Sequence, residues 1–380
     1  VQRMFDTALP ARDEVIAQYR VRAGAGAIEA RAQGIALEQS VELPLAAVHD
    51  RAVREAIVGR VLAIGDTGDG AFDVRFGLAP ATTGIEAGQL LNMLFGNSSI
   101  QEDVTLIDAE FPPALAAAFG GPRGGIAGLR ALAGVPERAL TCAALKPQGL
   151  SSAELAALAE QLALGGLDFI KDDHGLADQA YSPFAERISL CAQAVARAAQ
   201  TSGKLTRYFP SISGSLDSLR AQTRAAEDAG LAGVLIAPMI AGVASLQYLA
   251  REFPRMAFFA HPAMAGAARI APPLLLGKLF RLLGADATIF PNHGGRFGYT
   301  PATCRALAES ARAPWLGLKP TLPVAAGGMT PERVGEMLDF YGPDLMLLLR
   351  AGFLIQSARV TRATRDFSAT GAAHPRGLAR

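Results

Sequence analysis

The alternation of apolar and polar positions changes character near residue 120. Before that point, strand-like and helix-like stretches follow one another in no regular order. The pattern predicts strands at residues 15–21, 60–64, 70–76 and 104–111, and helices at 23–40 and 85–95. Grouped strands with separate helices are typical of an α+β domain. We therefore expect an α+β domain at residues 1–120, ending in the segment 119–125, which is dense in Gly and Pro.

After this segment, short apolar runs alternate with stretches rich in Ala and Leu. The expected strands lie at residues 140–145, 169–171, 205–211, 233–236, 257–260, 287–290, 322–325 and 345–349. About eight strands in roughly 260 residues is the count and length of a (β/α)₈ barrel, or TIM barrel. Their continuous apolar character suits parallel strands buried on both faces. We therefore expect an α/β barrel at residues 121–380, with a doubly wound sheet as the alternative and a loose, polar and basic tail from residue 361.

Composition and charge narrow the class of protein. Hydrophobic residues make up 50% of the chain and charged residues 19%, which excludes global disorder. Lys and Arg together number 36 and Asp and Glu 35, so the net charge of +1 gives no electrostatic case for nucleic acid or an anionic membrane. Cys142, Cys191 and Cys304 form neither a disulfide framework nor a zinc pattern, which fits a reducing setting. Without a long apolar stretch or a signal-peptide pattern, we expect a cytoplasmic protein.

Polar residues gather where the expected barrel strands end, which is where barrel enzymes carry their active sites. Three of the five histidines fall there. The strand ends carry Lys146, then Lys171 to His174, then His261, then the segment 292–296, then Gly327 and Gly328, and finally Gly352. Since polar side chains have no packing reason to collect at one rim, we expect the site at the barrel mouth.

The segment 171–174 is the most informative of these strand ends. Two carboxylates and an imidazole within it predict a divalent cation site, for Mg²⁺ or for Mn²⁺, Zn²⁺ or Fe²⁺. The alternative is a turn in which Asp172 or Asp173 caps the next helix. Lys146 is either a rim lysine held by the following proline or an ordinary surface lysine. Gly327 and Gly328 expose backbone N–H groups to an anion, although paired glycines are common in loops.

Taken in order, these motifs resemble those of the ribulose bisphosphate carboxylase/oxygenase (RuBisCO) family, and in particular its RuBisCO-like proteins. GGLDFIKDD at residues 165–173 is similar to the family's GGLDF-x-KDD-E metal motif, and LKPQGLS at 145–151 to its KPK-x-GLS motif. HPAM at 261–264 is similar to HRAM, VAAGGM at 324–329 to PVASGGI, and LFGN at 94–97 to the VGN segment. The matches span most of the chain.

The resemblance implies a homodimer whose active sites lie at the barrel mouth and are completed by the partner's N-terminal domain. Lys171 would be carbamylated by CO₂ and would bind Mg²⁺ with Asp173 and His174, and Lys146 would transfer protons. The resemblance also points to residues around the substrate: Gly327, Gly328 and Gly352 for phosphate, His261 and Arg296 for other substrate contacts, His293 as a further acid–base candidate, and Glu38 and Asn97 from the partner subunit.

The positions at which this sequence departs from the carboxylase motifs are as informative as the matches. His174 stands where the carboxylase has a metal-binding glutamate, and Gln148 where it has a second lysine. Pro262 replaces the arginine that holds a second phosphate. The loop 291–297 lacks the lysine that clamps CO₂, with Arg296 as its only cation, and Ala326 replaces a serine. The resemblance therefore implies a non-carboxylating enzyme with one phosphate site.

What remains is the machinery to enolise a phosphorylated ketose. A metal would polarise its oxygens while a lysine moves a proton on the adjacent carbon. Within the family we favour 5-methylthioribulose 1-phosphate isomerase, a reaction of sulfur salvage. Alternatives are a diketo-methylthiopentyl phosphate tautomerase, a decarboxylase or carboxyl transferase acting on 3-oxo-isoapionate 4-phosphate, and a non-catalytic relative. An unrelated alternative is a barrel aldolase with Lys146 or Lys171 as its Schiff-base lysine.

Overall fold

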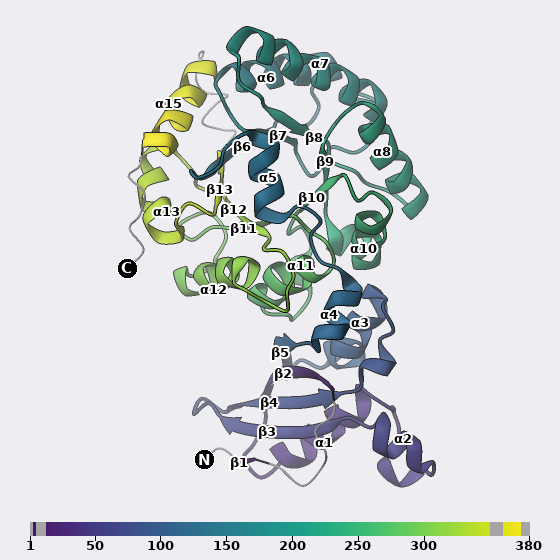
Figure 1. Ribbon diagram of the computed structural model, residues 1–380. Helices are drawn as coiled ribbons and strands as arrows, with labels where there is room; N and C mark the ends of the chain where they lie inside the picture. The colour runs from purple at the N-terminus through teal and green to yellow at the C-terminus, as the bar shows by residue number, and fades with distance from the viewer. Residues whose placement is uncertain (1–2, 5–12, 350–359, 374–380) are drawn as a thin grey trace. The chain divides into compact units, whose positions relative to one another are not determined.

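The computed structural model describes residues 3–4, 13–349 and 360–373, which form two compact units (Figure 1). One unit holds the chain up to Gly120 together with Met264–Leu275, and the other holds the rest. The change of unit at Gly120 lies inside the glycine-rich segment 119–125. The sequence did not indicate that Met264–Leu275 joins the first unit. It does so because its backbone pairs with Leu106, whose N–H donates to Arg269 O (3.0 Å).

The first unit is built on a five-stranded antiparallel sheet in the order β1-β3-β4-β2-β5. Its strands are β1 (Arg3–Met4), β2 (Val15–Arg22), β3 (Arg60–Asp66), β4 (Ala71–Leu78) and β5 (Val104–Glu110). Alternate residues of β2 are buried, as a strand with one face on a core requires. Its helices are α1 (Ile28–Glu38), α2 (Arg51–Ala56), α3 (Ala87–Phe95) and α4 (Pro113–Phe119), with 3₁₀ turns at Leu45–Ala47, Pro80–Thr82 and Asn97–Ile100.

The helices of this unit differ from the sequence prediction at several places, and α4 was not expected. Helix α1 begins at Ile28 rather than at residue 23, because the preceding stretch contains Gly24 and Gly26, which are poor helix formers. Helix α2 was not expected. It begins after Asp50, whose carboxylate accepts the N–H of Val53 (3.1 Å) and so caps the helix.

The second unit is a parallel barrel, which confirms the predicted fold class. Its strands are β6 (Leu140–Leu145), β7 (Phe169–Asp172), β8 (Arg207–Phe209), β9 (Gly233–Ile236), β10 (Ala257–Ala260), β11 (Ala287–Pro291), β12 (Leu322–Ala326) and β13 (Met346–Leu349). They follow the order β8-β7-β6-β13-β12-β11-β10-β9. The first and last strands of that order, β8 and β9, are also joined. Leu235 N–H of β9 donates to Pro210 O just after β8 (2.8 Å), and Ile212 N–H donates to Leu235 O (2.9 Å), which closes the barrel.

Helices surround the barrel and close one end of it (Figure 1). They are α5 (Gly125–Ala133), α6 (Ser152–Leu164), α7 (Phe184–Ser202), α8 (Leu216–Asp228), α9 (Pro238–Ala241), α10 (Val243–Glu252), α11 (Phe280–Leu282), α12 (Pro301–Arg312), α13 (Val334–Tyr341) and α15 (Val360–Ala373), with a 3₁₀ turn at Pro331–Arg333. A 3₁₀ turn at Ala265–Ala267 belongs to the first unit, and a π turn at Pro273–Leu279 begins in the first unit and ends in the second. Ile126 and Leu129 of α5 join the core inside the strands. The N–H groups of Gly124 and Gly125 donate to Asp286, just before β11 begins (2.9 and 2.7 Å). Helix α5 therefore covers the amino ends of the strands and leaves their carboxyl ends for the site.

The expected loose tail is wrong for residues 361–373, which belong to helix α15. Thr364 and Phe367 are fully buried, and α15 packs against α6 and α13. Val360, Thr364 and Phe367 repeat at helical spacing, a short stripe that the polar composition of the segment concealed. Gly352 lies outside the described residues.

Among the helices that the structure describes, none is long and apolar enough to span a membrane.

Candidate active site

Three side chains predicted from strand ends come together at the carboxyl edge of β6 and β7. The two strands pair in parallel, with Ala144 opposite Lys171, so Lys146 and Asp173 leave the sheet side by side. Lys146 Nζ lies 2.6 Å from Asp173 Oδ2. Lys171 and Asp173 are buried, whereas the side chain of Lys146 is 39% exposed. The cluster therefore joins buried groups to one lysine that solvent and a ligand can reach.

Asp173 is held as a carboxylate by hydrogen-bond donors on Oδ1 and by the ion pair of Oδ2 with Lys146. Its Oδ1 accepts the N–H of Gly175 (3.0 Å) and an amide hydrogen of Gln148 (3.2 Å). Burial alone would raise the pKa of Asp173, but the hydrogen bond from Lys146, the Gly175 N–H and the positive charge of Lys146 hold that pKa well below its usual range. Asp173 is thus charged across the neutral pH range.

Lys171 is a buried amine in the interior of the strand β7. Its Nζ donates to the backbone carbonyl of Asp172 (3.0 Å). Burial lowers its pKa, and the ammonium of Lys146 adds to this effect, while Cys142 and Asp173 oppose it. The neutral amine, which is the form that reacts with CO₂, is therefore easier to reach than in an exposed lysine.

His174 and His261 form a stacked pair of imidazoles. Their ring centroids are 4.0 Å apart and the ring planes differ by 10°. Burial lowers the pKa of both, and that of His261 falls to about 2, with the positive charge of Lys171 as the second cause. His261 Nδ1 accepts the N–H of Ala263 (3.1 Å). Both rings are neutral and available as nitrogen ligands or hydrogen-bonding groups.

Asp172 supports the site from behind and does not face Lys146. Its buried carboxylate accepts from Arg187 Nε (2.9 Å), from the Tyr208 hydroxyl (2.7 Å) and from the N–H of Ser211 (3.0 Å). The alternative of a helix cap at Asp172 or Asp173 is also wrong, because α7 begins only at Phe184. Arg187 and Tyr208 belong to this site but escaped sequence analysis, since no fixed spacing links them to Asp172.

The loops after β11 and β12 lie against each other. Gly327 and Gly328 have φ of 90° and 67°, and a Cβ on Gly328 would lie 3.3 Å from the Cα of Gly295. Arg333 donates to the carbonyls of Gly328 (3.5 Å) and His293 (3.2 Å). These contacts hold two glycine-bearing loops together, and only glycine adopts such a backbone readily.

Arg296 and His293 lie on the same loop, but their side chains contact different groups. The guanidinium of Arg296 lies 4.9 Å from the ring centroid of Phe297, and its charge contributes to the lowered pKa of His174. His293 packs instead on Phe340 of α13, with 4.7 Å between ring centroids. Within the described residues its Nε2 is buried and has no hydrogen-bond partner. Because aromatic packing holds its ring on α13, the structure does not bring His293 to the cluster of Lys146, Lys171 and Asp173.

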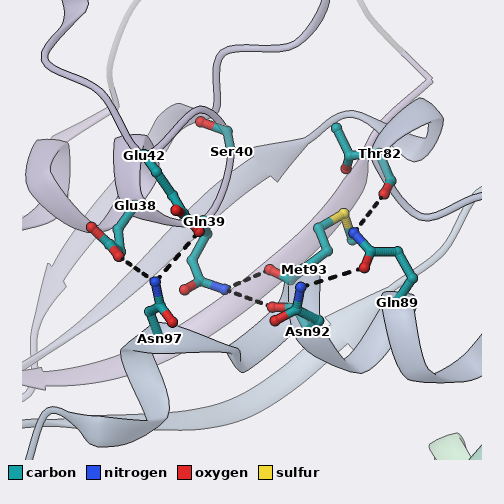
Figure 2. Close-up of a pocket in the computed structure, with 9 residues that line it drawn as sticks. All are labelled: Glu38, Gln39, Ser40, Glu42, Thr82, Gln89, Asn92, Met93 and Asn97. Atoms are coloured by element: carbon teal, nitrogen blue, oxygen red, sulfur yellow. Dashed lines mark hydrogen bonds between the residues drawn. The ribbon is translucent and has the colours of Figure 1, made fainter.

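Glu38 and Asn97 come together in a pocket of the first unit. Figure 2 shows Asn97 Nδ2 donating to Glu38 Oε1 (2.8 Å), with Glu42 Oε1 further away (3.4 Å). The neighbouring Gln39 is buried and ties the two segments together. It accepts from the Ser98 hydroxyl (2.7 Å) and donates to the carbonyl of Met93 (2.6 Å). The pocket therefore presents a carboxylate and an amide in fixed positions.

The residues at the barrel mouth fit a divalent cation only if Lys171 contributes. Across the described ranges no three His, Cys, Asp or Glu side chains form a ready metal site. Asp173 supplies a carboxylate and His174 a neutral imidazole, whose Nδ1 lies 3.4 Å from Asp173 Oδ1. A carbamate on Lys171 would supply the third ligand, and the lowered pKa of its amine makes that reaction easier than at an exposed lysine. The donor set of two carboxylate-type groups and one nitrogen suits Mg²⁺ or Mn²⁺.

Fold and site together define a (β/α)₈-barrel protein with a lysine–carboxylate cluster at the carboxyl ends of its strands. The family profile described as "Ribulose bisphosphate carboxylase large chain, catalytic domain" matches residues 125–354. The chain belongs to the ribulose bisphosphate carboxylase family, among its RuBisCO-like proteins.

Relatives and a solved structure agree with this assignment. The chain is 56% identical over 362 residues to "Ribulose bisphosphate carboxylase-like protein 1" of Rhodopseudomonas palustris, covering 95% of this chain and 98% of that protein. It is also 56% identical over 359 residues to a Rhodospirillum rubrum protein named 5-methylthioribulose-1-phosphate isomerase, covering 94% and 96%. The crystal structure of a Rubisco-like protein from Rhodopseudomonas palustris matches with a TM-score of 0.89 at 52% identity, covering 95% and 98%.

Proposed function

We propose that this chain is a non-carboxylating RuBisCO-like enzyme that isomerises a phosphorylated ketose by metal-assisted enolisation, with 5-methylthioribulose 1-phosphate as substrate. The observation that carries the chemistry is the contact between Lys146 and Asp173 (2.6 Å) beside the buried amine of Lys171. The substrate is supported by the Rhodospirillum rubrum relative of that name, to which the match extends over 94% of this chain.

Lys171, as a carbamate, would hold the cation together with Asp173 and His174. Carbamate formation joins the neutral amine to CO₂ and releases one proton. When bound by these residues, Mg²⁺ would supply a Lewis acid for the carbonyl and hydroxyl oxygens of the ketose. Asp173 is suited to its part because donors on Oδ1 fix the direction of its other oxygen.

Lys146 would carry out the proton transfer. As a neutral amine it would act as the general base that takes the proton from the carbon next to the carbonyl and returns it to the carbonyl carbon, while the hydroxyl proton passes to the former carbonyl oxygen, so the isomer has the same composition as the substrate. Its partly exposed amine faces the mouth, and the contact with Asp173 orients it. The phosphate would bind to the N–H groups of Gly327 and Gly328 and to Gly352. His261 and Arg296 would contact the rest of the substrate.

The proposed assembly is a homodimer in which Glu38 and Asn97 of one subunit complete the partner's site. Their hydrogen bond presents a carboxylate and an amide oxygen for substrate hydroxyls. The proposed setting is the cytoplasm, which agrees with three buried, unbridged cysteines.

The test is proton NMR of the purified protein in deuterated, bicarbonate-containing buffer with Mg²⁺ and 5-methylthioribulose 1-phosphate. We expect deuterium to enter the carbon next to the carbonyl, an isomeric sugar phosphate to form, and both to stop after EDTA treatment. Incubation with ribulose bisphosphate and ¹³CO₂ should give no labelled acid. Exchange confined to 2,3-diketo-5-methylthiopentyl 1-phosphate would replace isomerisation by tautomerisation, and fixation of ¹³CO₂ would overturn the proposal.

A further inference from the structure

Gln148 stands at a position where the structure gives it a defined contact inside the candidate site. Its Nε2 donates to Asp173 Oδ1 (3.2 Å), the oxygen that also accepts the N–H of Gly175 (3.0 Å). The other oxygen, Oδ2, is the one that lies 2.6 Å from Lys146. Oδ1 of Asp173 therefore accepts from two neutral donors, whereas Oδ2 contacts the ammonium of Lys146.

Gly175 has no side chain because the glutamine amide occupies that space. A Cβ at this position would lie 1.7 Å from Gln148 Nε2, and 3.3 Å from Asp173 Oδ1. The first separation is far inside van der Waals contact, whereas the second is tolerable. Any side chain at residue 175 would therefore displace the amide of Gln148, whereas Asp173 Oδ1 would have to give by only a few tenths of an ångström. The absence of a side chain at Gly175 therefore provides the space that the amide of Gln148 occupies.

We propose that Gln148, seated against Gly175, is a positioning residue that fixes the rotation of Asp173 and so keeps Oδ2 directed at Lys146 and the cation. Without the amide, Oδ1 keeps the Gly175 N–H but loses its second donor. His174 Nδ1, 3.4 Å from the same oxygen, then competes for it. A neutral donor suits this role because it adds no second ammonium beside Asp173 to oppose a bound cation.

Groups that orient a metal ligand typically contribute about 10- to 100-fold in metal affinity or activity. We therefore expect Gln148→Met, which keeps the side-chain length but removes the donor, to lose about 10- to 100-fold in kcat with KM little changed, since Gln148 acts on the cluster. The same variant should bind Mn²⁺ correspondingly more weakly in bicarbonate buffer, measured by electron paramagnetic resonance of the free ion. Gln193→Met, an exposed glutamine of α7 that bonds Ser189 (3.1 Å), is the matched control and should behave as wild type.

A double-mutant cycle tests the link between the two residues. Gly175→Ala should reproduce the loss seen in Gln148→Ala, because each removes the amide from Asp173. The double variant should then be no worse than either single variant. Losses that multiply in the double variant, or wild-type turnover and Mn²⁺ affinity in Gln148→Met and Gln148→Ala, would overturn the proposal.

The turnover arm of this inference rests on the proposed function, whereas the Mn²⁺ arm does not. If the wild-type protein binds Mn²⁺ and the variants bind it more weakly, the positioning role stands even when no isomerase activity is found. If the wild-type protein is an isomerase and Gln148→Met equals it in both measurements, the positioning role fails and the proposed function stands.

Discussion

The ion pair behind the site gives the sharpest prediction of stability. Arg187 and Asp172 are both fully buried, and Arg187 Nε lies 2.9 Å from Asp172 Oδ2. Arg187 also donates to the carbonyls of Ser182 (2.6 Å) and Ala177 (2.7 Å) in the loop between β7 and α7. Replacing Arg187 by methionine keeps most of the side-chain volume. The buried carboxylate of Asp172 then keeps only its two neutral donors, and the carbonyls of Ser182 and Ala177 lose their hydrogen bonds from Arg187.

Removing one partner of a buried pair costs about 3–5 kcal/mol, because the remaining charge stays desolvated. We expect Arg187→Met to lower the free energy of unfolding by about that amount. The control is Arg197→Met on the same helix, whose exposed guanidinium pairs with Glu160 (2.8 Å) and whose loss should be within error of zero. Adding Asp172→Asn to Arg187→Met should recover much of the stability, since it removes the orphaned charge.

The assay is urea unfolding followed by the fluorescence of Trp315, the chain's single tryptophan, which belongs to the barrel unit. The comparison holds if the dependence of the unfolding free energy on urea is the same in all variants. A loss in Arg187→Met no larger than in Arg197→Met would refute the reasoning. So would a double variant less stable than Arg187→Met.

Two further predictions follow from the proposed function. Lys146→Met should keep the fold and Mn²⁺ binding yet slow exchange of the substrate's carbon-bound proton about 10²–10⁴-fold, measured by NMR in deuterated solvent; exchange at the wild-type rate would assign the base to another group. Mixing inactive Lys171→Ala chains with inactive Asn97→Ala chains should restore part of the activity, because one hybrid site holds both native residues. No recovery after confirmed subunit exchange would count against a shared site.

The barrel strands were predicted closely from the sequence because their signal is local. The runs 233–236 and 257–260 coincide with β9 and β10, since strands buried on both faces are apolar throughout. The segment 205–211 was predicted too long, because only Arg207–Phe209 pairs with β7 in the ladder. Burial extends past the paired residues at Thr206 and Ser211, whereas Leu205 is apolar but 51% exposed, so its hydropathy misled the prediction.

Contacts between distant segments left no comparable signal. The carboxylate of Asp172 meets Arg187 and Tyr208 across different elements, and the amide of Gln148 meets Asp173 from the next strand. Gln148 was visible only as a departure from a family motif, and nothing in the sequence tied it to Gly175. Glu38 and Asn97 were each named by resemblance alone, and the hydrogen bond between them was not predicted, because their separation along the chain encodes no distance.

The alternation of a β-strand explains why the adjacent residues 171–173 have opposite roles. Side chains at positions i and i+2 share one face of a strand, and the residue between them points to the other. Lys171 and Asp173 therefore lie on the face that joins Lys146, while Asp172 is directed to Arg187 of α7. Each face of the strand end thus carries a carboxylate with a different partner, Lys146 for Asp173 and Arg187 for Asp172. The carboxylate of Asp173 is available for the proposed chemistry, and that of Asp172 fixes the strand end to the helix layer. Exchanging Asp172 alone for a neutral residue should therefore loosen the loop that carries Asp173 and His174 without removing a proposed metal ligand.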